Sequence, residues 1–226
     1  ALTITVNKTR LKSRIAYLPG DLSVDVVWTT DINSGINPVQ RVKAYCDAQK
    51  LKAGVSDILN QLKTFLQNDR NAYGYHIYID KVKDPILLAT SVNQSNYPGM
   101  PSVYAIISKL KSQAVLKGAK QTAFPMLNIT KVSPASYQVS MALPVDKMIS
   151  TDKGTFINKM VAGGNLLVTD VKGGPNTIAD ALGQIKQYMK DHKLISPAMP
   201  FESLVTDRVA ERDTSKWVTK IYYPIF

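Results

Sequence analysis

The sequence predicts an α+β protein in which tandem β-α-β-β repeats form one antiparallel sheet with helices on one face. Three observations support this fold class. The spacing of apolar residues alternates along the chain between the period of a strand and that of a helix. Two successive segments of the chain show the same order of elements. The chain has 226 residues, 45% of them hydrophobic, which suffices for a packed core.

The segment 1–72 is predicted to contain strands followed by one long helix. Residues 2–6 and 22–26 alternate as strands do, and Pro19-Gly20-Asp21 between them predicts a turn. Residues 31–40 are predicted to form a loop. From about 47 to 67 the apolar residues recur at helical spacing, at Leu51, Val55, Ile58, Leu59, Leu62, Phe65 and Leu66. We expect Leu51, Val55, Ile58, Leu62 and Phe65 of this stripe to be buried. The polar residues 68–71 then suggest a boundary between a domain at 1–72 and one at 73–226.

The repeat occupies residues 75–226, and each copy begins with an apolar strand. These strands lie at 86–92 and 165–171, and they align so that Ile86 corresponds to Asn165. Each leads through a Gly/Pro turn into an amphipathic helix, where proline suits the first turn because the N–H groups there have no partner. The apolar faces of the two helices carry Val103, Ile106, Ile107 and Leu110, and Ile178, Leu182, Ile185 and Met189.

Two further strands complete each copy. The second strands are predicted at 125–129 and 200–204. The third strands, at 137–144 and 217–224, align so that Pro144 corresponds to Pro224. Alternation assigns the residues of the third strands to two faces. Toward the helices we expect Tyr137, Val139, Met141 and Leu143, then Trp217 and Ile221; away from them we expect Gln138, Ser140 and Ala142, then Val218, Lys220 and Tyr222. A ligand cleft is expected between the copies.

Composition argues against several kinds of site. The single cysteine, Cys46, excludes a disulfide framework and a cysteine-based metal site. His76 and His192 lie near no carboxylate pair at metal-ligand spacing, and the Gly-Gly pairs do not match a phosphate-binding loop. We therefore expect no metal, no cofactor and no independent catalytic constellation.

The chain is basic, with 28 Lys and Arg against 17 Asp and Glu and a net charge of +11. The excess is spread along the sequence, whereas nucleic-acid-binding proteins cluster it, so we expect no direct nucleic-acid binding. A spread basic surface also suits contact with an anionic membrane surface or a protein partner. No apolar run approaches the ~20 residues of a membrane span. Because the chain begins at Ala1, we expect a piece of a longer protein, which is cytoplasmic or attached to the envelope through an upstream segment.

The repeat, together with Met199-Pro200-Phe201-Glu202 and the ending Trp217-Val218-Thr219-Lys220-Ile221-Tyr222-Tyr223-Pro224, resembles the GyrI-like small-molecule-binding domain. This is also the effector-binding domain of bacterial transcription activators. The resemblance covers about 75–226 and departs at Lys220, where the family often has Glu. It implies a bacterial protein related to transcription regulators that senses or sequesters a small hydrophobic, often cationic, molecule between its repeats. The first segment resembles part of a START-like helix-grip domain, which precedes GyrI-like domains in some bacterial proteins.

The resemblance implies that Glu202 is the buried glutamate that supports the ligand. The sequence itself also singles out Glu202. It is one of only two glutamates and lies in an apolar strand, where burying a carboxylate costs free energy. In the alternative, Glu202 faces solvent or pairs with Lys220. Tyr222 and Trp217 are candidates to stack on a flat or cationic ligand, although Trp217 also suits the core. The predicted ligand-binding residues are thus Glu202, Tyr222, Trp217 and Lys220.

Two other functions stay open at this point. Some GyrI-like proteins resemble hydrolases of electrophilic compounds, which implies Glu202 and Tyr222 as an acid–base pair. An envelope-surface structural or partner-binding role is the other alternative, with the basic surface as the contact.

Overall fold

The computed structural model describes residues 2–6, 9–21 and 23–226. Leu22, which the sequence places in a strand, lies outside the described residues. The chain divides into two compact units, Ala1–Ala72 and Tyr73–Phe226. Within the described ranges, no helix is both long enough and apolar enough to cross a membrane.

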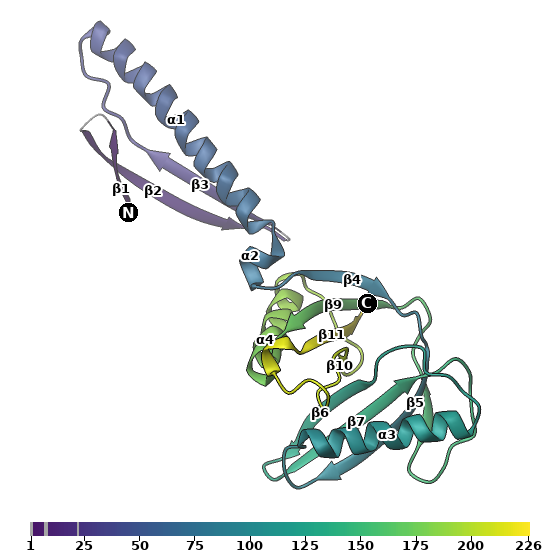
Figure 1. Ribbon diagram of the computed structural model, residues 1–226. Helices are drawn as coiled ribbons and strands as arrows, with labels where there is room; N and C mark the ends of the chain where they lie inside the picture. Colours follow the sequence, from purple (N-terminus) through teal and green to yellow (C-terminus); the bar gives the residue numbers. More distant parts are fainter. Residues whose placement is uncertain (1, 7–8, 22) are drawn as a thin grey trace. The chain divides into compact units, whose positions relative to one another are not determined.

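The first unit contains an antiparallel sheet of β1 (Leu2–Val6), β2 (Thr9–Pro19) and β3 (Val24–Thr30), followed by α1 (Pro38–Leu66) and α2 (Asp69–Tyr73) (Figure 1). The predicted turn is confirmed, since the Gly20 N–H donates to the Ser23 carbonyl at 2.7 Å. The helix begins earlier than predicted. The Asn37 side chain accepts from the Val39 N–H at 2.9 Å and Pro38 occupies the first turn, which together start a helix well before its apolar stripe.

The expectation that the stripe of α1 is buried is wrong. No residue of this helix is buried, and Leu62 and Phe65 are 39% and 55% exposed. The half-buried apolar side chains lie on one flank, at Ala44, Ala48, Leu51, Val55 and Leu59. The predicted stripe spans a wide arc of the helix, and a unit with one small sheet offers too little apolar surface to cover all of it.

The second unit is built on an eight-stranded antiparallel sheet with the order β4-β9-β11-β10-β6-β7-β5-β8 (Figure 1). Two helices, α3 (Met100–Leu116) and α4 (Pro175–Asp191), pack on it, and a short 3₁₀ helix, Thr214–Lys216, precedes the last strand. The strands are β4 (Ile77–Lys81), β5 (Ile86–Gln94), β6 (Met126–Ser133), β7 (Ser136–Pro144), β8 (Phe156–Lys159), β9 (Asn165–Lys172), β10 (Phe201–Leu204) and β11 (Val218–Ile225).

Strand register confirms the tandem repeat. Leu87 pairs with Pro144 in the first copy, and Leu166 pairs with Pro224 in the second. The sequence alignment of the copies equates Leu87 with Leu166 and Pro144 with Pro224, so these two pairs are equivalent, as a repeat requires. The copies are β5-α3-β6-β7 and β9-α4-β10-β11. They join where β6 pairs with β10, so the junction lies in the middle of the sheet.

Two short strands that the sequence did not reveal are exchanged between the copies. β4 precedes the first copy but pairs with β9 of the second, and β8 precedes the second copy but pairs with β5 of the first. Such short strands carry little periodic signal, and tertiary pairing decides their partners. This exchange ties the two copies together.

Both helices cover the same face of the sheet. One core packs α3 against β5, β6 and β7, and a second packs α4 against β9 and β11. Glu202 lies opposite both Leu127 of the first core and Ile221 of the second, and cross-strand partners share a face. The predicted orientation of the third strands is therefore confirmed, with Val139, Met141 and Ile221 buried under the helices.

Candidate functional site

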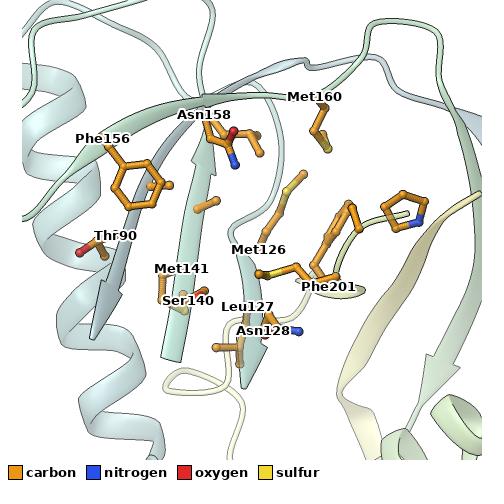
Figure 2. A pocket seen from close by; sticks show the side chains of 16 residues that line it. Thr90, Met126, Leu127, Asn128, Ser140, Met141, Phe156, Asn158, Met160 and Phe201 are labelled. Carbon is orange, nitrogen blue, oxygen red and sulfur yellow. The ribbon is translucent and has the colours of Figure 1, made fainter. Parts of the chain in front are cut away.

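A cavity of about 200 Å³ lies on the sheet at the junction of the two copies. Figure 2 shows Phe156, Asn158 and Met160 along its upper side and Met126 and Phe201 further down. The first copy and the segment of β8 supply most of the lining, and the second copy adds Phe201 of β10, Pro224 of β11, and Ala198 and Met199 of the connection before β10. The lining comprises Leu87, Ala89, Thr90, Met126, Leu127, Asn128, Ser140, Met141, Ala142, Phe156, Asn158, Met160, Ala198, Met199, Phe201 and Pro224.

Strand register explains why the sheet is hollow at this position. Phe156, Ala89, Ala142 and Met126 are successive cross-strand partners across β8, β5, β7 and β6. Ala142 alternates with the helix-facing Met141, so this row lies on the face that the helices leave uncovered. Two alanines between two bulky side chains leave a gap that no neighbouring side chain on the row fills.

The second copy fills the equivalent position. Its row, across β9, β11 and β10, consists of Val168, Tyr222 and Phe201, where the first copy has Ala89, Ala142 and Met126. The rings of Tyr222 and Phe201 stack with centroids 4.9 Å apart. The cavity is therefore a difference between the copies, caused by small residues in only one of them.

The cavity lining is mainly apolar: it includes the polar residues Thr90, Asn128, Ser140 and Asn158, but no charged side chain of the described residues. Asn128 is already engaged, since its Nδ2 donates to the Pro200 carbonyl at 2.7 Å and its Oδ1 accepts from Thr130 at 2.8 Å. Three methionines, Met126, Met160 and Met199, contribute flexible, polarisable surface that adapts to the shape of a ligand. Such a lining suits a neutral and mainly apolar molecule.

A polar cluster, formed by Glu202, Arg208, Trp217 and Thr219, lies on the opposite, helix-covered face. Arg208 is only 6% exposed. Its Nη2 lies 3.6 Å from a carboxylate oxygen of Glu202 and donates to Thr219 Oγ1 at 2.8 Å. Its guanidinium carbon lies 4.9 Å from the centre of the Trp217 ring, a cation–π distance. Burial raises the pKa of Glu202, and the charge of Arg208 opposes that rise.

Arg208 lies in the long connection between β10 and β11, which places its side chain in the polar cluster. The Asp207 side chain accepts from the Val209 and Ala210 N–H groups and so fixes the turn there. The Arg208 N–H donates to the Tyr104 hydroxyl of α3 at 2.6 Å, which anchors the turn to the first copy. Sequence reasoning missed this residue because it lies in a charged connection with no periodic pattern.

The structure separates the four predicted ligand-binding residues into two pairs. Glu202 and Trp217 belong to the polar cluster on the helix face. Tyr222 and Lys220 alternate with the buried Ile221, and therefore lie on the helix-free face. Tyr222 stacks on Phe201 at the edge of the cavity, and burial raises its pKa. Glu202 pairs with Arg208 rather than with Lys220, whose Nζ lies 3.2 Å from Asp170.

No three potential metal ligands of the types His, Cys, Asp and Glu come together in the part of the chain that the structure describes. The polar cluster and the cavity are two features of the second unit to which a function can be attached.

Together, the duplicated β-α-β-β units and their single sheet define a GyrI-like fold for the second unit. No protein-family model and no curated protein matches the sequence. Among solved structures, the C-terminal domain of EcmrR is 17% identical with a TM-score of 0.56, over 67% of this chain and 98% of that domain. EcmrR in its DNA complex (EcmrR-RPo) is 17% identical with a TM-score of 0.58, over 84% of this chain and 72% of that one. A conserved Listeria innocua protein is 12% identical with a TM-score of 0.50, over 66% of this chain and 92% of that one. At such identities these similarities establish the fold.

Proposed function

We propose that the second unit binds a small, neutral and mainly apolar molecule in the cavity at the junction of its two copies, for sensing or sequestration. The observation that carries this proposal is the cavity itself, whose described lining combines both copies and contains no charged side chain. The resemblance to GyrI-like domains supports the hydrophobic character of the ligand, since these hold hydrophobic, often cationic, compounds between their repeats, whereas the neutral charge is inferred from the cavity lining alone.

The size of the cavity limits the ligand. A cavity of roughly 150 Å³ in another protein accommodates benzene. About 200 Å³ therefore suits one or two small rings or a short branched alkyl group. A charged ligand is disfavoured because no countercharge of the described residues lines the cavity, and an unpaired charge is costly to remove from water.

The hydrolase alternative loses its acid–base pair. Glu202 faces the helices, whereas Tyr222 lies on the other face of the sheet, so the two side chains do not share one site. Binding without turnover is therefore the function that this geometry supports best.

The proposal is tested with three naphthalene derivatives of similar shape: neutral 1-aminonaphthalene, cationic 1-naphthylmethylammonium and anionic 1-naphthalenesulfonate. Each is titrated into the full chain at pH 7, with fluorescence or calorimetry as the readout. We expect the neutral compound to bind at least about tenfold more tightly than either ion, because the ions lose hydration without gaining a partner. Equal affinities for the three compounds would contradict a neutral site.

The site is located with a substitution that copies the second repeat. Ala142→Tyr places in the first copy the side chain that fills the equivalent position at Tyr222, and should reduce binding of 1-aminonaphthalene at least about tenfold. Ala179→Tyr adds the same side chain at an exposed position of α4 and serves as the control. Ala89→Val, the smaller change toward the second copy, provides a second test if Ala142→Tyr unfolds. Undiminished binding by a folded variant would place the ligand elsewhere.

A further inference from the structure

The end of α3 exposes two neighbouring apolar side chains, Val115 and Leu116, which we call the apolar pair. Val115 is 74% exposed and Leu116 is 83% exposed. The helix ends directly after them in a turn across Gly118, whose φ is +73°. The Ala119 N–H closes this turn by donating to the Ala114 carbonyl at 2.8 Å. The turn is thus held by backbone atoms, and the apolar pair contributes little to the core.

The second copy ends its helix in the same way, but with polar side chains. After α4 the equivalent bond runs from the Leu194 N–H to the Met189 carbonyl, again at 2.8 Å. The two residues that follow the accepting carbonyl are Lys190 and Asp191, and both are exposed. They occupy the positions of the apolar pair. The fold therefore accepts two charged residues here, and packing does not explain why the first copy has two hydrocarbon side chains.

Lysines gather around the apolar pair from two segments of the chain. The Lys120 N–H donates to a carboxylate oxygen of Asp146 at 2.8 Å, and Lys117 Nζ lies 3.3 Å from Asp152. These contacts hold the connection between β7 and β8 against the end of α3. Within that connection, Lys147 Nζ reaches the turn that follows the apolar pair.

The resulting surface is cationic around an apolar centre. The segments 109–120 and 146–153 contain six lysines and two aspartates, and the aspartates are the two engaged at the end of α3. All six lysines are exposed. The charge excess is dispersed along the sequence, so its concentration here arises only from the fold. We call this surface the α3-end patch; it consists of Val115 and Leu116 with Lys109, Lys111, Lys117, Lys120, Lys147 and Lys153.

We infer that the α3-end patch docks on a lipid surface with anionic headgroups, and that Val115 and Leu116 enter the boundary between headgroups and acyl chains. Lysines near such a surface are attracted to anionic headgroups, and their alkyl stems can lie along apolar surface. Exposed apolar side chains beside them add binding through the area that they bury in the lipid. Each chemical part of the patch thus has a counterpart at an anionic lipid surface.

A lipid surface suits this patch better than a protein partner does. A stable protein interface buries about 800 Å² on each side around an apolar core, whereas the α3-end patch has only two apolar side chains at its centre. The inference does not depend on the proposed function, because neither Val115 nor Leu116 nor any lysine of the patch lines the cavity.

Vesicle sedimentation with the full chain tests the inference. Vesicles of phosphatidylcholine with about one third phosphatidylserine are compared with vesicles of phosphatidylcholine alone, at about 0.1 M salt. We expect the native chain to bind the anionic vesicles at least about tenfold more tightly than the neutral ones. The absence of this preference would overturn the inference and leave the patch to a protein partner.

The apolar pair is tested by copying the second copy into the first. Val115→Lys/Leu116→Asp leaves the net charge unchanged and should weaken binding to the anionic vesicles at least about tenfold, because the apolar contribution is lost. Val161→Lys/Ile195→Asp makes the same exchange at two residues that are 80% and 71% exposed, and should bind like the native chain. Equal binding by the native chain and Val115→Lys/Leu116→Asp would overturn the inference, since it would show adsorption by net charge alone.

The lysines have a matched control on the other helix. Lys147→Gln/Lys153→Gln should weaken binding to the anionic vesicles at least about tenfold, whereas Lys186→Gln/Lys190→Gln, which removes two exposed lysines of α4, should not. Equal losses in these two variants would contradict a localised patch.

A fluorescent label reports insertion without relying on a loss of binding. A nitrobenzoxadiazole dye on Leu116→Cys, in a Cys46→Ser background that removes the free thiol, should brighten and shift to shorter wavelength on the anionic vesicles. The same dye on Ile195→Cys should not change. A dye at position 116 that stays unchanged while the chain sediments with the vesicles would overturn the inference.

Discussion

Replacing the whole polar cluster with its counterparts from the first copy should not destabilise the fold. In the triple variant, Glu202→Leu copies Leu127 and Thr219→Val copies Val139. Arg208→Met replaces the arginine above them with an apolar side chain of similar length. Exchanging a buried ion pair for apolar residues is often neutral or stabilising by about 1–4 kcal/mol. We expect the lower end of that range, because the Glu202 side chain keeps 19% of its exposure.

Breaking the cluster at one position should have the opposite effect. Arg208→Met alone leaves the Glu202 carboxylate buried beside Thr219 without a cation. Removing one partner of a buried pair costs about 3–5 kcal/mol, and the residual exposure of Glu202 again favours the low end. The triple variant and Arg208→Met should thus change the free energy of unfolding in opposite directions, although both remove the same arginine.

Urea unfolding followed by far-ultraviolet circular dichroism measures both effects, with similar m-values as evidence that the folded states are comparable. A triple variant less stable than Arg208→Met would refute the reasoning. It would show that the cluster stabilises the fold through its polar contacts.

The remaining predictions concern single positions. Leu62→Ala should cost less than about 1 kcal/mol because Leu62 is 39% exposed, whereas Leu167→Ala, fully buried, should cost about 2–5 kcal/mol in urea unfolding. Burial raises the pKa of Glu202 in the folded state, so ionisation of this group opposes folding as the pH rises through that pKa. The melting temperature of Glu202→Gln minus that of the native chain should therefore increase from pH 4 to pH 8. A difference that stays constant over this range would contradict the prediction. Asp170→Asn should cost at most about 1 kcal/mol, and less in salt, because its pair with Lys220 is exposed.

The repeated architecture was predictable because it depends on strong local patterns. Apolar strands, proline-opened helices and the equivalent third strands each leave a periodic signal, and their alignment agrees with the register of Leu87 with Pro144 and Leu166 with Pro224. The exchanged strands β4 and β8 were not predictable, since nothing local states that each pairs with the other copy. How many apolar residues of α1 are buried also depends on the apolar surface of the elements packed against it, and the periodicity of the helix sequence does not reveal that surface.

The candidate sites were harder to predict, for two physical reasons. Alternation alone places Tyr222 and Lys220 on one face, but only the register of Glu202 with Ile221 shows that the glutamate faces the other way. The cavity arises from absent volume at Ala89 and Ala142. Alanine in a strand carries no chemical signal, although comparing the two copies position by position would have revealed the difference.

The most direct test of the central claim is a crystal structure of the full chain with 1-aminonaphthalene bound. We expect its rings on the helix-free face, in contact with Phe156, Met126 and Phe201 and over Ala142. A ligand found beside Glu202 and Arg208 under the helices, or a cavity left empty at a concentration that saturates binding in solution, would contradict it.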